Sequence, residues 1–517
     1  MTPTSPAKLF WLSLLMAFWA FYGLVGRDAW KPEEVLALSP VLDWLAGLTS
    51  IWSTPAPLYT LVAAATAQLG FTSDPQDGAR LASGLFTVIA LIFSGLSARA
   101  LFGPGFGLAA AIALVGGFGL MLRAHALLPD AALLSAWSIL FYGICAARKR
   151  HLDAVLAIGL AFSMLVLGLR GLPDAVAGLT ILLLLMLSPA WRERNYLQSV
   201  SRGLLLATCV IAISLIYVWA SGNLNGWLRW HGIEQVGQMR SPSSAFSELP
   251  WFAWPLWPLA IVAVWSEHRR LARVPELHLP LLAVVVLLVG ALVPTWSRDS
   301  ALMPVLLPLA LIAAYGVDNL RRGAAQGFYW FGVLLFAFLA VAFWVYFSAI
   351  EWGYPTRVAA RLARMTPSYR PGTVDATAYV VAMGATLLWF TVIPLFPRAK
   401  NRPILVWATG MILVWVLITA LFRPWIEAGW AYRPLIADMS RHLPAGSCLN
   451  ARVDPAMKTS LRLHLKAPEQ ANCAWTLKLV TSHAGKSEPD QGNTVIWKGY
   501  RPRAKAQVYQ LERRESN

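Results

Sequence analysis

Long apolar runs recur along most of this chain, from Leu9 to Phe422. Each run has about 17 to 22 residues, which is enough for a helix to cross the hydrocarbon core of a bilayer. Hydrophobic residues make up 57% of the sequence and charged residues only 13%, whereas a typical soluble domain carries about 25% charged residues. The sequence therefore predicts a polytopic α-helical membrane protein.

Hydropathy places about thirteen spans in the sequence. They lie near residues 9–25, 81–98, 104–122, 127–147, 152–169, 174–190, 203–220, 251–266, 278–294, 300–317, 327–349, 376–396 and 403–422. Basic residues gather on every second connection between these spans, as at Arg99 and at Arg148-Lys149-Arg150. By the positive-inside rule these connections are cytoplasmic, which predicts a cytoplasmic N-terminus and an outer C-terminus.

The tail after the last span differs in composition from the rest of the chain. Residues 1–422 form the predicted membrane domain, and residues 423–517 a small α+β domain on the outer side. Alternating apolar and polar residues at Thr494–Lys498 and Ala506–Leu511 predict strands in this tail.

Charge and cysteine use narrow the partners and the compartment. Much of the formal net charge of +17 lies on the cytoplasmic connections, so the basic composition does not argue for nucleic-acid binding. Cys448 and Cys473 both lie in the tail. An oxidising compartment would allow a disulfide between them if they are close in space, which sequence spacing alone does not show.

A charged cluster opens the first outer region, about residues 26–80. Two basic and three acidic residues follow the first span directly: Arg27, Lys31, Asp28, Glu33 and Glu34. Ionisable groups beside lipid are candidates for a functional site. The alternative is an interfacial anchor in which Glu33 and Glu34 begin a helix, because acids in a first turn suit the helix dipole. Further on, Pro57–Phe71 is apolar but short, which predicts a helix lying in the interface.

A second informative acid is Asp130, at the outer start of the fourth span. Pro129 precedes it, and Arg123 and His125 lie a few residues upstream. As a helix N-cap, Asp130 would satisfy backbone donors. The alternative is a functional role. Because the outer ends of the spans lie close together in a compact bundle, the Asp130 carboxylate would face Glu33 across one lipid-accessible groove.

Taken together, these features resemble the GT-C membrane glycosyltransferases. The features are an acidic loop after the first span, an interfacial helix beginning Pro57-Leu58-Tyr59, and an Asp at the outer start of the fourth span. The closest resemblance is to bacterial lipid A aminoarabinose transferases and protein O-mannosyltransferases. Their Trp-x-Pro-Asp-Glu is similar to Trp30-Lys-Pro-Glu-Glu34 here. The likeness covers nearly the whole chain.

The resemblance implies a polyprenyl (undecaprenyl) phosphate sugar as donor, on the periplasmic face of a bacterial inner membrane. The implied acceptor is lipid A or another envelope glycan or protein, and the implied reaction is direct displacement with inversion. Glu33 takes the place of the family's first-loop Asp and Asp130 that of its second-loop Asp, with Asp28 and Glu34 as alternatives. One departure is Ser53–Pro57, which replaces the family's acid-Lys-Pro-Pro and removes a lysine expected to contact donor phosphate.

Cations are expected near the leaving phosphate, because they stabilise the negative charge that develops there. The residues predicted to contact donor or acceptor are Arg27, Lys31, Tyr59, Arg123, His125, His231, Arg240 and Arg298. The alternative for the arginines and the lysine is contact with phospholipid headgroups. No cofactor is predicted with certainty, and a divalent metal bound by outer carboxylates stays open.

Two other functions remain open at this point. A transporter or flippase would also be polytopic, but transporters tend to place ionisable groups near the bilayer midplane, whereas the acids here gather at one face. The second is a catalytically inactive relative that binds or scaffolds glycolipid, and the missing acid-Lys motif before Pro57 keeps this alternative open.

Overall fold

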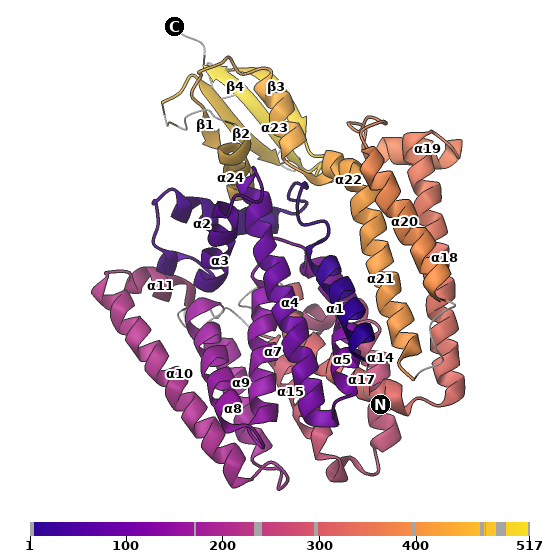
Figure 1. The fold of residues 1–517 in the computed structure, drawn as a ribbon. Coiled ribbons are helices and arrows are strands. Elements are labelled where there is room, and N and C mark those ends of the chain that lie inside the picture. Colours follow the sequence, from indigo (N-terminus) through magenta and orange to yellow (C-terminus); the bar gives the residue numbers. More distant parts are fainter. Residues whose placement is uncertain are drawn as a thin grey trace. The chain divides into compact units, whose positions relative to one another are not determined.

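The structure of the protein is a computed structural model, drawn as a ribbon in Figure 1. It describes residues 5–169, 172–231, 240–293, 298–393, 400–465, 470, 472–481 and 493–514. The chain packs into two compact units. The first comprises residues 1–25, 40–338 and 386–415, and the second residues 26–39, 339–385 and 416–517.

The described part of the first unit consists of helices and connecting turns. Its helices are α1 (Pro6–Phe21), α3 (Pro57–Gln68), α4 (Pro75–Phe102), α5 (Phe106–Val115), α6 (Phe118–Arg123), α7 (Asp130–Ala146), α8 (His151–Ser163), α9 (Leu172–Leu185), α10 (Arg194–Ala220), α11 (Leu224–His231), α12 (Pro242–Phe246), α13 (Leu249–Phe252), α14 (Leu256–Glu267), α15 (His278–Gly290), α16 (Arg298–Leu302) and α17 (Leu306–Asn319). The helices α2 (Pro32–Leu45), α18 (Arg322–Glu351), α20 (Ala376–Val392) and α21 (Arg402–Leu421) each contribute residues to both units.

The sequence explains how α4 begins and how it packs. The Asp74 side chain accepts a hydrogen bond of 2.9 Å from the Gln76 backbone N–H, and Pro75 occupies the first turn, where its missing N–H costs nothing. Further along, a Cβ on Gly107 would lie 2.9 Å from the Gly95 carbonyl oxygen. Only glycine at position 107 allows this close approach of α5 to α4.

Every predicted span contains a helix, although these helices differ in length. Among the described residues, six helices are long and apolar enough to cross a membrane. A seventh span is added if Pro242–Phe252 and Leu256–Glu267 are counted as one bent pair. The other predicted spans contain apolar helices of 10–17 residues. Since a helix of ten residues is only about 15 Å long, the count of thirteen crossings stays a prediction, as does their orientation.

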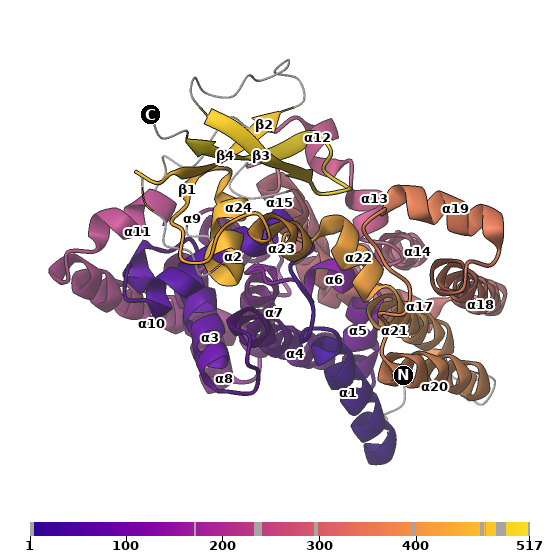
Figure 2. The same ribbon diagram turned by 90° about the horizontal axis from the view of Figure 1, so that it is seen from above.

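The second unit contains a mixed sheet with helices on one face (Figure 2). Its remaining elements are α19 (Thr356–Met365), α22 (Arg423–Trp430), α23 (Arg433–Ser440), β1 (Asn450–Arg452), α24 (Pro455–His464), β2 (Trp475–Thr481), β3 (Asn493–Tyr500) and β4 (Gln507–Arg514). The described strands are ordered β1-β2-β4-β3, with β1 parallel to β2 and the other two pairs antiparallel. The two stretches predicted as strands lie in β3 and β4.

The core of this unit joins the beginning of the chain to its end. Leu477 and Leu511 of the sheet pack with Ile436 of α23 and Met457 of α24, and all four are at most 1% exposed. Ala29 and Val35, from the loop that follows α1, belong to the same buried cluster. The apolar residues of the first loop therefore help to complete the core of the tail. The sequence places the boundary between the membrane domain and the tail domain after residue 422. That boundary stays a prediction.

Candidate active site

Glu34 and Arg27 form a buried ion pair at the start of α2. The Arg27 guanidinium donates to both oxygens of the Glu34 carboxylate, at 2.8 and 3.3 Å, and each side chain is only 3% exposed. The Trp30 backbone N–H donates to the same carboxylate at 2.9 Å, and the Arg27 guanidinium lies 4.5 Å from the centre of the Trp30 ring. Glu34 is thus engaged in holding the loop, although it was predicted as an alternative catalytic acid.

Asp28 is contacted by residues from the end of the chain. Its backbone N–H donates to Glu427 Oε1 at 2.9 Å. Its carboxylate lies 3.6 Å from His464 Nε2 and 3.7 Å from Arg433 Nε. Asp28 is 7% exposed, so this first-loop acid lies in a largely buried charged cluster.

The pKa values of the two carboxyl groups in this cluster move in opposite directions. Burial acts to raise the pKa of Asp28, but the hydrogen bond and charge of His464 and the charge of Arg433 outweigh it, so the pKa lies below its ordinary value. The pKa of Glu427 lies above its ordinary value, because burial raises it by more than the hydrogen bond from Asp28 and the charge of Arg423 lower it. Asp28 therefore loses its proton more readily, and Glu427 less readily, than an ordinary carboxyl group of the same type.

Glu33 and Lys31 are the exposed members of the first-loop cluster. Glu33 stands in the first turn of α2 beside the buried Glu34. The helix start that sequence offered as an alternative to catalysis is therefore present, and it leaves Glu33 accessible. Glu33 belongs to the second unit and Asp130 to the first, so the groove predicted to be shared by the two acids stays a prediction.

Asp130 is held by Arg123 in the first unit. Arg123 Nε donates to Asp130 Oδ2 at 2.5 Å, and both side chains are 3% exposed. The same guanidinium donates to Ser300 Oγ at 2.8 Å and lies 3.6 Å from Asp299 Oδ2. Pro129 is the N-cap of α7, without a side-chain cap bond. Asp130 is therefore not the N-cap but the carboxylate partner of Arg123.

His125 and Tyr59 are packed inside the first unit. His125 is fully buried, with Nε2 2.7 Å from the Trp19 carbonyl oxygen and Nδ1 3.1 Å from that of Met121. Its ring stacks on Trp415 with 4.0 Å between centroids. The Tyr59 hydroxyl lies 2.8 Å from Ser83 Oγ. These contacts hold helices of the first unit together. A role in substrate binding for His125 or Tyr59 stays a prediction.

Two of the remaining predicted residues, His231 and Arg240, lie in the stretch between α10 and α14. His231 ends α11, stacks on Trp227 and is 3% exposed. Burial lowers the pKa of the His231 imidazole by more than its backbone hydrogen bonds raise it. The imidazole is therefore neutral at pH 7. The half-buried Arg240 donates its backbone N–H to the Leu292 carbonyl oxygen at 2.8 Å. The Arg298 side chain lies outside the described residues.

Sequence reasoning missed the partners of Asp28 in the tail. One signal was available for Glu427, which is the only acid between residues 376 and 437 and follows the last apolar run closely. No such signal marks His464 or Arg433. The structure joins Cys448 and Cys473 in a disulfide. Within the described residues, no group of three or more His, Cys, Asp or Glu residues is arranged to hold a metal ion.

Comparison with known proteins identifies the fold. No protein-family model and no curated protein matches the sequence. The apo structure of ArnT from Cupriavidus metallidurans superimposes with a TM-score of 0.65 and 16% identity over 98% of both chains. This chain has the ArnT fold. The same ArnT bound to undecaprenyl phosphate gives a TM-score of 0.64 and 13% identity, again over 98% of both chains.

A more distant similarity is to the oligosaccharyltransferase AglB from Archaeoglobus fulgidus, solved with an inhibitory peptide and a dolichol-phosphate. Its TM-score is 0.41 at 10% identity, covering 77% of this chain and 61% of AglB. That score is too low to support an argument about this chain. The similarity to ArnT, by contrast, extends over the membrane helices and the tail together, and it confirms the fold to which the sequence motifs pointed.

Proposed function

We propose that this protein transfers a sugar from a polyprenyl phosphate, such as undecaprenyl phosphate, to lipid A or another envelope acceptor. The observation that carries the proposal is the fold shared over 98% of both chains with an ArnT bound to undecaprenyl phosphate. Because folds host many functions, the residues must supply the chemistry independently. The exposed Glu33, the buried Arg123–Asp130 pair and the Asp28–Glu427 cluster are the groups available for it.

The proposed reaction is a direct displacement with inversion. An acceptor oxygen attacks the anomeric carbon while the bond from that carbon to the phosphate oxygen breaks, and the electron pair leaves on the lipid phosphate. The phosphate is a good leaving group but carries negative charge, so a nearby cation stabilises the transition state. Lys31 is the exposed cation next to Glu33 in this sequence, and we assign it to the phosphate.

If the acceptor is a hydroxyl, its proton must pass to a base as the new bond forms. We assign this role to Glu33, because the ion pair with Arg27 already engages Glu34 and because contacts with the tail hold Asp28. If the acceptor is a phosphate, as on lipid A, it is already anionic, and Glu33 orients it instead. Asp130, fixed by Arg123, is assigned to positioning the sugar.

The test is a transfer assay with purified protein in lipid nanodiscs, undecaprenyl-phosphate sugars and lipid A, with products measured by mass spectrometry. With a hydroxyl acceptor, E33Q should reduce transfer by about 10²–10⁴-fold, the range that a general base contributes, whereas transfer to a lipid A phosphate should fall less. E248Q, which changes another exposed acid, should keep wild-type activity. Full activity of a well-folded E33Q protein would remove the assignment of Glu33. Absence of transfer by the wild-type protein with every donor would favour the inactive glycolipid-binding relative.

A further inference from the structure

A cavity of about 360 Å³ lies within the second unit, at the C-terminal end of α18. Its walls come from the end of α18, from α19 and the turn after it, and from Trp425 of α22. Apart from Thr366 and Tyr369, the residues that line it are apolar or glycine. Ligand pockets in proteins have volumes of about 300–1,000 Å³ and mostly apolar walls, so this cavity has the size and lining of a binding site.

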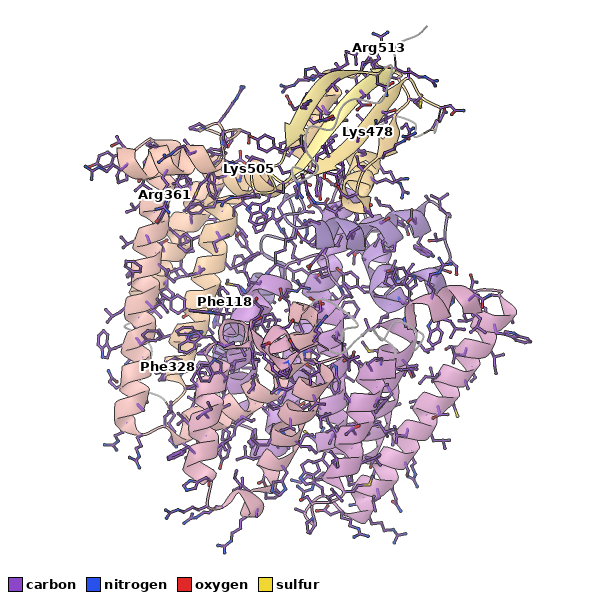
Figure 3. The ribbon with its side chains drawn as sticks, turned by 180° about the vertical axis from the view of Figure 1, so that it is seen from behind. Phe118, Phe328, Arg361, Lys478, Lys505 and Arg513 are labelled. Carbon is purple, nitrogen blue, oxygen red and sulfur yellow. A yellow bond between two sulfur atoms is a disulfide. The ribbon has the colours of Figure 1, made fainter. Side chains whose placement is uncertain are left out.

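The helix α19 presents two different faces. Arg357, Arg361 and Arg364 recur at the spacing of one helical face, and all three are exposed. Ala359 and Ala363 lie on the other side of the helix and line the cavity. Figure 1 shows α19 running crosswise to α18, and Figure 3 marks Arg361 on it. A short helix with a basic face and an apolar face is typical of elements that lie at a membrane surface.

The surroundings of the cavity are strongly basic. The segment from Trp352 to Val374 carries four arginines and no acidic residue. The adjacent acid, Glu351, accepts hydrogen bonds from the Tyr369 hydroxyl and from the Gly372 N–H, the latter at 2.7 Å. A further cation comes from the tail, where the Arg503 guanidinium lies 5.6 Å from the Trp425 ring centre. The edge of the cavity therefore favours an anionic ligand.

One polar group inside the cavity lacks a partner. Thr366 is 2% exposed and lines the cavity, and its Oγ1 has no hydrogen-bond partner among the described residues. A buried hydroxyl left without a hydrogen bond is unfavourable. A ligand that brings an acceptor oxygen, such as an ester carbonyl, into an otherwise apolar cavity would satisfy it.

Two exposed aromatic residues lie between the helices that line the cavity. Trp352 and Tyr354, between α18 and α19, are 66% and 73% exposed. Trp and Tyr are enriched at the level of lipid headgroups. The cavity therefore combines apolar walls with a hydroxyl that can donate a hydrogen bond, and it has a basic edge and interfacial aromatic residues beside it. These features match a lipid that has an acyl ester and a negatively charged headgroup.

We propose that this cavity binds one anionic glycerophospholipid of the membrane. An acyl chain occupies the space beside Ala359 and Ala363, its ester carbonyl accepts a hydrogen bond from Thr366, and the phosphate is bound at the edge by Arg503. The bound lipid holds α19 against α22. This site is separate in its residues from the clusters assigned to sugar transfer, so the two proposals can fail independently.

The test measures lipid binding by native mass spectrometry after delipidation and addition of phosphatidylglycerol, phosphatidylcholine or undecaprenyl phosphate. The wild-type protein should retain phosphatidylglycerol in preference to phosphatidylcholine. A363W, which fills the cavity, should abolish that retention, whereas A376W, at an exposed position on α20, should not. T366V keeps the shape of the wall and should bind phosphatidylglycerol about two- to tenfold more weakly, the effect of one hydrogen bond.

The charge requirement is tested with the R503E variant. It should lose the preference for phosphatidylglycerol, whereas K149E, which reverses another exposed cation, should keep it. Equal retention of both phospholipids, or retention unchanged in A363W and T366V, would overturn the proposal. Displacement of phosphatidylglycerol by undecaprenyl phosphate in a manner sensitive to A363W would also overturn it, because the cavity would then belong to the sugar donor.

Discussion

Asp130 accepts a hydrogen bond of 2.5 Å from Arg123 Nε, with both side chains only 3% exposed. Since the other nearby carboxylate, Asp299, is 34% exposed and 3.6 Å away, Asp130 is the principal counter-charge of a buried guanidinium. This relationship makes the pair important for stability as well as for the reaction assigned to it.

Removing Asp130 should therefore destabilise the protein. D130A leaves the Arg123 guanidinium buried without its main counter-charge, and breaking a buried pair from one side costs about 3–5 kcal/mol. Thermal unfolding followed by tryptophan fluorescence should show a clearly lower midpoint. The double variant R123M/D130A should recover part of the loss, because the buried guanidinium is removed together with its main counter-charge. The control E193Q, which breaks the more exposed Arg148–Glu193 pair, should change the midpoint little.

The opposite pKa shifts of Glu427 and Asp28 predict opposite dependences of stability on pH. The pKa of Glu427 is raised above its ordinary value of 4.5. Its ionisation therefore destabilises the folded state as the pH rises through the folded pKa. E427Q keeps an oxygen acceptor for the Asp28 N–H and removes this charge. It should be more stable than wild type at neutral pH, with no difference below pH 4.5.

For Asp28 the sign is reversed, because its pKa lies below the ordinary value of 3.8. Its contribution to stability is fully present above that value and is lost as the pH falls through the folded pKa. D28N should therefore be less stable than wild type at neutral pH, and the difference should shrink in acid. Parallel pH profiles for wild type and both variants would contradict the described cluster.

The transfer proposal requires Glu33 and Asp130 to serve one reaction, which a chemical cross-link can test. Asp299 is a partly exposed neighbour of the Arg123–Asp130 pair, and it is more accessible than Asp130 itself. In a C209S background, E33C/D299C should be cross-linked by a short bismaleimide. E33C/K149C should not react in this way. If both single thiols react with maleimide but no cross-link forms, the proposed shared site is wrong.

The disulfide should stabilise the tail. Cys448 and Cys473 are separated by 25 residues, and closing a loop of that length is worth about 3–4 kcal/mol in the chain-entropy model. C448S/C473S should make the tail more susceptible to limited proteolysis, with cleavage sites in residues 423–517. C145S, which changes a buried thiol outside the tail, serves as the control. Equal proteolysis of all three proteins would show that the bridge does not limit unfolding of the tail.

Local features of this protein could be predicted from sequence. Apolar runs mark the helices because a membrane requires length and hydropathy, and the alternation at Thr494–Lys498 marks β3 because side chains in a strand alternate between faces. The start of α2 at Pro32 also follows from its proline and its two acids. In each case the signal lies within a few residues of the element that it specifies.

The partners of the charged groups could not be predicted in this way. Spacing within the first loop does not show that Glu34 pairs with Arg27 while Glu33 stays exposed, because this depends on the direction in which α2 leaves the loop. The contact of Asp28 with Glu427 spans 399 residues and depends on how the tail folds. Pairings of this kind follow from tertiary structure rather than from any local pattern.

The joint core of the first loop and the tail has a consequence for biosynthesis. Ala29 and Val35 emerge from the ribosome early, yet the residues that cover them, such as Ile436 and Leu511, are made near the end of translation. The 399 residues that separate Asp28 from Glu427 take on the order of 20–80 s to synthesise at about 5–20 residues per second. During this delay the newly made loop must wait with its apolar side chains uncovered, so assembly of this protein cannot proceed strictly from its first residue to its last.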